Sequence, residues 1–246
     1  MKGRAVVAAM TLLAGCTYHP ILPKDHKVTL LYVALGDSTV EGVGATSAAT
    51  TYPARLFTRL RAIYPRAGVI NLGVGGATSA DVVNDQLERA VVMRPKLVTL
   101  SVGPNDITDH VPVAEYEANV GTIFRRFAGE IGTVVVVNLL PDLSVTPRFR
   151  GRENEREVAQ LTVEFNAALT RQARLYAVEV VDLYKPSQVE VPRRPELLAA
   201  DGYHPSDLGY ARWAELLWTG VERRMGRRAG VPNTTPAAAV EGARES

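Results

Sequence analysis

Short apolar runs alternate with helical patterns along most of the chain. Continuous runs of β-branched and other apolar residues, each about the length of a strand, are typical of parallel strands that are covered on both faces. Five such runs predict five strands, at residues 28–35, 68–73, 96–103, 133–140 and 177–184.

The segments between these runs predict helices. Residues 111–131 and 155–176 place apolar side chains on one face at helical spacing, and a last helix is expected to begin near an N-cap at Ser206. On spacing, Trp213 and Trp218 are expected to pack in the core or on the surface rather than to form a ligand platform. Alternating strands and helices predict an open α/β sheet with right-handed crossovers. In such a sheet the functional site lies beyond the carboxyl ends of the strands.

Length and composition indicate one folded domain with short appendages. A chain of 246 residues can bury one sizeable core, and the apolar share of 46% and charged share of 22% are ordinary for a globular protein. The formal charge of +2 includes Lys2 and Arg4, so it falls to zero if the N-terminal segment is removed. A net charge near zero gives no indication that the protein binds nucleic acid or an acidic partner.

The first sixteen residues predict a targeting segment. Lys2 and Arg4 precede an apolar run that is too short to span a bilayer, and the run ends in "LAGC". This ending resembles the bacterial lipoprotein signal, in which the cysteine is lipidated and becomes the mature N-terminus. Cys16 is the only cysteine of the chain, which favours lipidation over an ordinary secretory signal or a buried N-terminal helix.

The resulting organisation has four parts. We predict a lipoprotein signal peptide at 1–15, a tether at 16–27, a folded domain at 28–225 and a disordered tail at 226–246. Acyl chains on Cys16 would anchor the protein to a membrane without spanning it. A single cysteine leaves none for a disulfide within the mature chain or for a thiolate zinc site. No His/Asp/Glu cluster has metal spacing and no phosphate loop appears, so no metal and no cofactor are expected.

Glycines and polar residues follow the predicted strands. The stretch "ALGDSTVEGVGA" follows the first strand and contains Ser38, "NLGVGGATS" follows the second and contains Gly73, and "SVGPNDITDH" follows the third and contains Asn105. Before the last helix, "DGYHP" places Asp201 three residues ahead of His204. Each stretch alone is compatible with an ordinary turn or cap.

Together, the four stretches resemble the motif blocks of the SGNH (GDSL-type) hydrolase family over about residues 30–222. The matching blocks are Gly36-Asp37-Ser38, Gly73, Gly103-Pro104-Asn105-Asp106 and Asp201-Gly202-Tyr203-His204-Pro205. One departure is Thr39, where the family name has leucine at a position that is not catalytic. The resemblance implies a three-layer α/β/α, flavodoxin-like fold with a five-stranded parallel sheet.

The resemblance also implies a role for each site residue. Ser38 would be the nucleophile, His204 the base that takes its proton, and Asp201 the carboxylate that fixes the histidine tautomer. The N–H groups of Ser38 and Gly73 and the side chain of Asn105 would form the oxyanion hole. The family motifs give His110 no role.

These observations predict a membrane-tethered, extracytoplasmic serine esterase that works through an acyl-Ser38 intermediate. Two substrate classes stay open: short acyl groups such as acetyl on a polysaccharide, and lysophospholipid or longer acyl esters and thioesters. The loops at 141–154 and 185–200 contain five arginines that are compatible with an anionic substrate, although charged loops are more often solvated: Arg148, Arg150, Arg152, Arg193 and Arg194. The alternative is a non-catalytic envelope lipoprotein that binds glycan or a partner through the same fold. Retention of every catalytic block argues against it.

Overall fold

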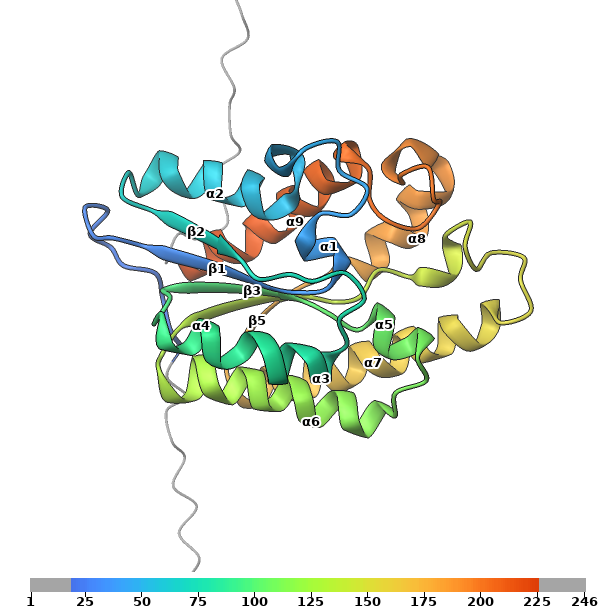
Figure 1. Ribbon diagram of the computed structural model, residues 1–246, viewed down its shortest axis with the longest axis horizontal. Helices are drawn as coiled ribbons and strands as arrows, with labels where there is room; N and C mark the ends of the chain where they lie inside the picture. The colour runs from blue at the N-terminus through green and yellow to red at the C-terminus, as the bar shows by residue number, and fades with distance from the viewer. Residues whose placement is uncertain (1–18, 226–246) are drawn as a thin grey trace, which may run out of the picture.

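Five parallel strands form one sheet in the order β2-β1-β3-β4-β5 (Figure 1). The computed structural model describes residues 19–225. The strands are β1 (Leu31–Gly36), β2 (Gly68–Asn71), β3 (Leu97–Ser101), β4 (Val134–Asn138) and β5 (Glu179–Val181). Each overlaps one predicted apolar run, so the predicted five-stranded sheet is confirmed. The inner strands β1, β3 and β4 are almost wholly buried, which explains their continuous apolar sequence.

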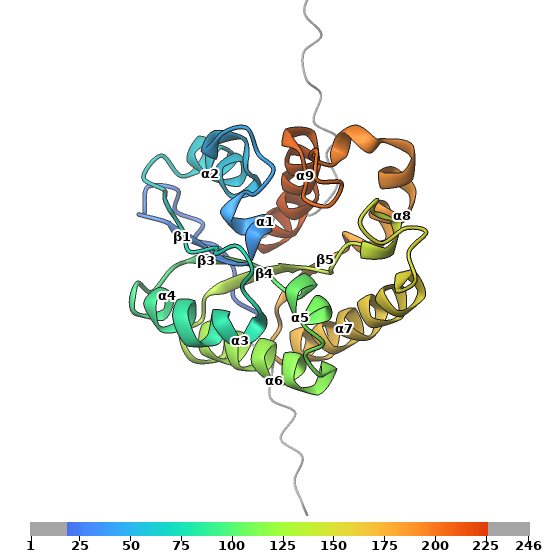
Figure 2. The same cartoon turned by 45° about the vertical axis from the view of Figure 1, so that its right-hand side comes forward.

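Helices cover both faces of the sheet, as the three-layer prediction requires (Figures 1 and 2). The helices α2 (Tyr52–Ile63) and α9 (Asp207–Arg224) lie on one face. The opposite face carries α4 (Glu88–Val92), α6 (Val113–Phe124) and α7 (Glu155–Leu175). The Ser206 hydroxyl accepts a hydrogen bond from the Gly209 N–H at 3.3 Å and caps α9, as predicted.

Shorter helical segments complete the described part of the chain. The α-helical ones are α1 (Ser38–Glu41), α3 (Ser79–Asp81), α5 (Pro104–Thr108) and α8 (Tyr184–Arg193). The π-helical ones are η2 (Val82–Leu87) and η3 (Arg125–Glu130), which continue α3 and α6. The 3₁₀ turns are η1 (Ala48–Thr50), η4 (Leu143–Val145) and η5 (Pro195–Leu197).

The alternation of side chains along β1 separates two hydrophobic clusters. Tyr32 and Ala34 point to the layer of α2 and α9, whereas Val33 and Leu35 point to the layer of α6 and α7. Both tryptophans are buried or nearly so, and belong to the cluster of α2 and α9. They pack in the core, which agrees with the prediction made from their spacing.

The strand order changes direction at β1. From β1 the chain crosses to β2 on one side and then to β3 on the other, so the loops after β1 and β3 diverge and leave a crevice at the carboxyl edge. Gly36 ends β1 beside Ser101, with φ +140, and a Cβ there would lie 1.8 Å from the Ser101 carbonyl oxygen. Only glycine fits this approach. It sets Ser38 beside the loop that carries Asn105.

The described part of the predicted tether, residues 19–27, is packed against the domain. Leu22 is 1% exposed and its N–H donates to the Arg224 carbonyl at 2.8 Å. The Pro23 carbonyl accepts a hydrogen bond from the Tyr64 hydroxyl at 2.7 Å. Residues 19–27 are therefore part of the fold rather than a free tether, because the buried Leu22 side chain anchors them. The prolines and polar residues around Leu22 had favoured a tether in the sequence analysis.

Several predictions fall outside the described residues. These are the signal peptide at 1–15, lipidation of Cys16 and the tail at 226–246. Among residues 19–225, no helix combines the length and the apolar character needed to cross a bilayer.

Candidate active site

Ser38 lies at the start of the short helix α1, directly after β1. Asp37 caps this helix: its Oδ1 accepts hydrogen bonds from the Thr39 N–H at 2.9 Å and from the Thr39 hydroxyl at 2.7 Å. The Ser38 side chain is mostly buried, and within residues 19–225 its N–H donates to no protein acceptor. The turn therefore presents both a hydroxyl and a free N–H at the carboxyl edge of the sheet.

The structure brings Ser38, His204 and Asp201 into one hydrogen-bonded series. The His204 Nε2 lies 2.9 Å from the Ser38 Oγ, and the His204 Nδ1 lies 2.6 Å from the Asp201 Oδ2. When Nδ1 carries the proton that faces the carboxylate, Nε2 keeps a lone pair directed at the serine hydroxyl. A base and its orienting carboxylate require this arrangement.

A tight loop before α9 holds Asp201 and His204 in place. The Ala199 N–H donates to the His204 carbonyl at 2.8 Å, and Gly202 turns the chain at φ +66, which glycine adopts without strain. The second carboxylate oxygen of Asp201, Oδ1, accepts the N–H groups of Tyr203 at 2.9 Å and His204 at 3.0 Å. Both oxygens of the carboxylate are therefore fixed.

Two carboxyl groups beside the site, those of Asp37 and Asp201, differ in pKa. Partial burial of Asp201 favours its neutral form, but hydrogen bonds from the His204 ring and two backbone N–H groups outweigh burial and hold its pKa below the ordinary value. Burial raises the pKa of Asp37 to about 6, despite the hydrogen bonds from Thr39. Asp201 thus stays ionised at neutral pH in its contact with His204.

Thr39 has a structural role that sequence reasoning missed. Its hydroxyl donates to the buried Asp37 and lies 3.0 Å from the Ser101 hydroxyl, so it ties the turn after β1 to the end of β3. A leucine, which the family name has at this position, would keep only the backbone hydrogen bond to Asp37. The polar character of Thr39 is the signal that could have indicated this role.

The Gly73 N–H is engaged within the protein, contrary to the expectation that it is an oxyanion donor. It donates to the Asn71 Oδ1 at 2.9 Å, and the Asn71 amide donates to the Val40 carbonyl at 2.6 Å. A Cβ at Gly73 would lie 2.5 Å from the Glu41 backbone nitrogen, so a glycine is needed for this loop to pack on α1. Gly73 therefore positions the loop.

Two N–H groups further along the same loop are free. Within residues 19–225, the N–H groups of Gly75 and Gly76 donate to no acceptor, and Gly76 has φ +81 with open space where a Cβ would be. The Asn105 amide donates to the Ala77 carbonyl at 2.9 Å, which places this turn beside Asn105 and leaves its second amide hydrogen available. Gly76 is thus a better backbone donor than Gly73. The adjacent glycines of "VGGA" were the sequence signal.

A buried carboxyl fixes the helix that presents Asn105. Asp106 accepts hydrogen bonds from the Ser79 N–H at 2.9 Å and from the Ser79 hydroxyl, and the Asn119 amide donates to the same hydroxyl at 3.0 Å. Burial raises the pKa of Asp106 to about 6, although the bonds from Ser79 lower it. These contacts join α3, α5 and α6 beneath the site.

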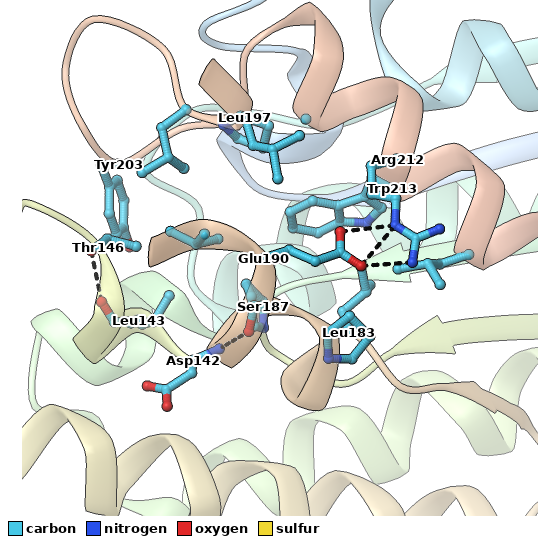
Figure 3. A pocket seen from close by; sticks show the side chains of 17 residues that line it. Asp142, Leu143, Thr146, Leu183, Ser187, Glu190, Leu197, Tyr203, Arg212 and Trp213 are labelled. Carbon is cyan, nitrogen blue, oxygen red and sulfur yellow. Dashed lines mark hydrogen bonds and ion pairs between the residues drawn. The ribbon is translucent and has the colours of Figure 1, made fainter. Parts of the chain in front are cut away.

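An apolar cavity of about 90 Å³ lies between α8, α9 and the loop after β4 (Figure 3). Leu183, Leu197, Tyr203 and Trp213 line it, and Figure 3 shows the Glu190 carboxylate facing the Arg212 guanidinium at one side, 2.7 Å away. Ser38, His204 and Asn105 do not line this cavity. It is therefore separate from the hydrogen-bonded series at Ser38.

No cluster of three or more His, Cys, Asp or Glu side chains within residues 19–225 is arranged to hold a metal ion. The four histidines of the chain fall in different places. His204 is in the site, His110 lies in a left-handed turn after α5 with φ 56, and His26 packs on Tyr64 at 5.0 Å. His19 lies 3.4 Å from Arg224.

A serine, a histidine and an aspartate in series, beyond the carboxyl ends of a parallel sheet, define the geometry of an α/β serine hydrolase. The comparisons with known proteins give the family. The chain belongs to the GDSL-like lipase/acylhydrolase family, whose model matches residues 34–212.

Two sequence relatives are esterases. An acetylxylan esterase from Geobacillus stearothermophilus is 27% identical over 193 residues, which cover 71% of this chain and 83% of the relative. A GDSL-like esterase from Mycobacterium tuberculosis is 29% identical over 213 residues, which cover 80% of this chain and 63% of the relative. The chain thus spans less than two thirds of that second protein.

Solved structures share the fold. The crystal structure of TesA has a TM-score of 0.63 at 22% identity, covering 80% of this chain and 99% of the other. A structure of the acetyl xylan esterase Axe2 from Geobacillus stearothermophilus has a TM-score of 0.62 at 21% identity, covering 78% and 94%. With the family and the esterase relatives, this chain is a carboxylic ester hydrolase.

Proposed function

We propose that the protein hydrolyses short-chain carboxylic esters, with an acetyl ester of a carbohydrate as the first candidate, through an acyl-Ser38 intermediate. The observation that carries the proposal is the contact of His204 with Ser38 at 2.9 Å on one side and with Asp201 at 2.6 Å on the other. The similarity to an acetylxylan esterase supports the choice of acyl group and alcohol.

The reaction would proceed in two steps. His204 Nε2 takes the proton of Ser38 as its Oγ attacks the ester carbonyl, and His204 then returns that proton to the leaving alcohol as the acyl group passes to Ser38. In the second step, His204 takes a proton from the water that attacks the acyl group. It then gives this proton to the Ser38 Oγ as the acyl–oxygen bond breaks and the acid is released. Asp201 keeps Nδ1 protonated and stabilises the imidazolium in both steps.

Three donors would receive the negative charge that develops on the carbonyl oxygen. We assign them to the Ser38 N–H, the Gly76 N–H and the second amide hydrogen of Asn105, since the first two have no acceptor within residues 19–225. Donors that are fixed before the reaction cost no reorganisation when the charge appears.

We also propose that the protein is extracytoplasmic and anchored to a bacterial membrane through acyl chains on Cys16. The support is the sequence "LAGC" after a charged and short apolar start. Cys16→Ser should move the protein from the membrane fraction to soluble or precursor forms. Unchanged fractionation, with no lipid mass on wild-type Cys16, would refute the anchor.

A panel of 4-nitrophenyl esters from acetyl to palmitoyl tests the substrate proposal on the protein lacking residues 1–16. We expect the highest kcat/KM with acetyl or another short acyl group, and release of acetate from acetylated xylan. A maximum at long chains would favour lysophospholipid or longer acyl esters instead. No turnover of any member, by a folded protein, would favour the non-catalytic alternative.

A further inference from the structure

The structure distinguishes four of the five loop arginines by what their guanidinium groups contact. Arg194 is paired with Glu196 at 3.0 Å and so has its own counter-charge. Arg148 lies with its Cζ 4.6 Å from the centre of the Tyr203 ring and 5.5 Å from that of Phe149. Within residues 19–225, Arg148 makes no ion pair and no hydrogen bond to an acidic side chain.

Arg148 is close to the reacting groups. The Tyr203 ring on which it lies makes an edge contact with the His204 ring, with 5.1 Å between the ring centres. A single aromatic ring therefore separates the guanidinium from the imidazole that contacts Ser38. Arg150 and Arg152, further along the same exposed loop, make no such ring contact in the described part of the chain.

Arg148 and Phe149 also line a cavity of about 350 Å³. On its other side the cavity is lined by Ile107 and Thr108 of α5, the helix that presents Asn105. The cavity thus joins the neighbourhood of the oxyanion donor to that of the stacked arginine. Ser38, His204 and Asn105 do not line this cavity, so it borders the reacting groups through α5 and Arg148 without containing them.

The remaining charged and polar residues of this cavity limit which anion fits. His110 and Asn154 offer nitrogen donors, whereas Glu157 contributes the carboxylate on the α7 side. A singly charged group is therefore repelled less by Glu157 than a doubly charged phosphate would be.

We propose that Arg148 is a specificity residue that binds a carboxylate carried by the ester substrate, a few bonds from the ester group. One face of the guanidinium rests on Tyr203, which leaves the edge N–H groups free for a bidentate contact with a carboxylate. Contact with two rings also reduces the side-chain freedom that is lost when the anion binds. This inference rests on the proposed function, because it names the charge of the substrate of that site.

Two pairs of esters test it on the protein lacking residues 1–16. Mono-4-nitrophenyl adipate and its neutral methyl ester place the charge on the acyl side. The second pair, 4-acetoxybenzoate and its methyl ester, places it on the alcohol side. For wild type we expect kcat/KM to favour the anion by about fivefold to tenfold in one of the two pairs, mainly through KM. Since salt screens an exposed contact, the preference should decline in 1 M NaCl.

Arg148→Gln should reduce the anion-to-neutral ratio of kcat/KM to about one, and Arg148→Lys should restore part of it. Arg152 is in the same loop but contacts no ring within residues 19–225, so Arg152→Gln should leave the anion-to-neutral ratio at the wild-type value. If the wild-type enzyme prefers the anionic ester in neither pair, the inference is overturned. An equal loss for both members in Arg148→Gln would also overturn it, because Arg148 would then position Tyr203 rather than bind charge. If wild type hydrolyses none of the four esters, the proposed function itself fails.

Discussion

Replacing Asp201 by asparagine keeps the shape of the side chain but reverses its hydrogen bonding with His204. In the protein, one oxygen of Asp201 accepts two backbone N–H groups and the other faces the His204 Nδ1 at 2.6 Å. The asparagine can keep its single oxygen on the backbone, in which case its NH₂ group faces Nδ1. That orientation stabilises the tautomer with its proton on Nε2, which then cannot take the proton of Ser38.

If the asparagine amide is rotated by 180°, little of the lost activity is recovered. Its oxygen would then accept from Nδ1, but its NH₂ group would face the N–H groups of Tyr203 and His204, which leaves donors without an acceptor. Both orientations therefore reduce activity. When a buried triad aspartate is replaced by asparagine, kcat falls by roughly 10⁴-fold. Since the Asp201 side chain is 45% exposed, water replaces part of the lost interaction, and we expect about 10² in kcat/KM.

The assay is kcat/KM for 4-nitrophenyl acetate at pH 7 to 8, with thermal unfolding as the control for folding. Asp207→Asn is a matched control, because Asp207 is a half-buried aspartate at the start of α9 that contacts Thr46 rather than the histidine. It should retain wild-type turnover. A loss of less than about threefold in Asp201→Asn would refute the assignment of Asp201 as the orienting carboxylate.

Three further predictions concern the residues around the site and the N-terminal segment. Asp37 has a pKa raised by burial to about 6, so between about pH 4 and pH 6 the folded state keeps a proton that the unfolded state has released. The free energy of unfolding should therefore fall as pH rises through this window, and Asp37→Asn should flatten the slope in urea titrations; an unchanged slope would contradict the pKa shift. Asn105→Ala should lower kcat by about 10²–10³ with little change in KM, as the loss of an oxyanion donor does, and an effect confined to KM would contradict the role. Leu22→Ala should cost about 2 kcal/mol of unfolding free energy, the low end for a buried leucine because the segment is terminal, and a cost near zero would mean that residues 19–27 are not part of the fold.

Much of the fold could be predicted because the sequence carries it locally. The strands β1, β3 and β4 are buried on both faces, so their short, largely β-branched apolar runs favour strands over helices. The order of the motif blocks likewise anticipated that Ser38 and His204, 166 residues apart, meet at one edge of the sheet.

Other features depend on tertiary contacts that no local pattern records. The helix α8 lies largely within the predicted loop 185–200 and contains Pro186 and Pro192. Glu190 holds it to Arg212 of α9, and the Ser187 hydroxyl accepts the Asp142 N–H at 2.8 Å. The resemblance to the family blocks placed an oxyanion donor at Gly73.

Which glycine N–H is free depends on the Asn71 side chain, which accepts the Gly73 N–H and leaves that of Gly76 without an acceptor in the described residues. The contact of Asn71 with Gly73 cannot be predicted from local sequence, whereas the adjacent glycines at 75 and 76 could have indicated the free N–H groups.

The most direct test of the account is the rate and the position of covalent labelling by a fluorophosphonate. The account predicts that the phosphonate is found on the peptide that contains Ser38, that Ser38→Ala abolishes the label, and that His204→Ala slows labelling by at least about 10² because the serine has lost its base. Ser47→Ala, at an exposed serine outside the site, should label like wild type. A label on another serine, or an unchanged labelling rate in His204→Ala, would contradict the claim that Ser38 and His204 carry the reaction.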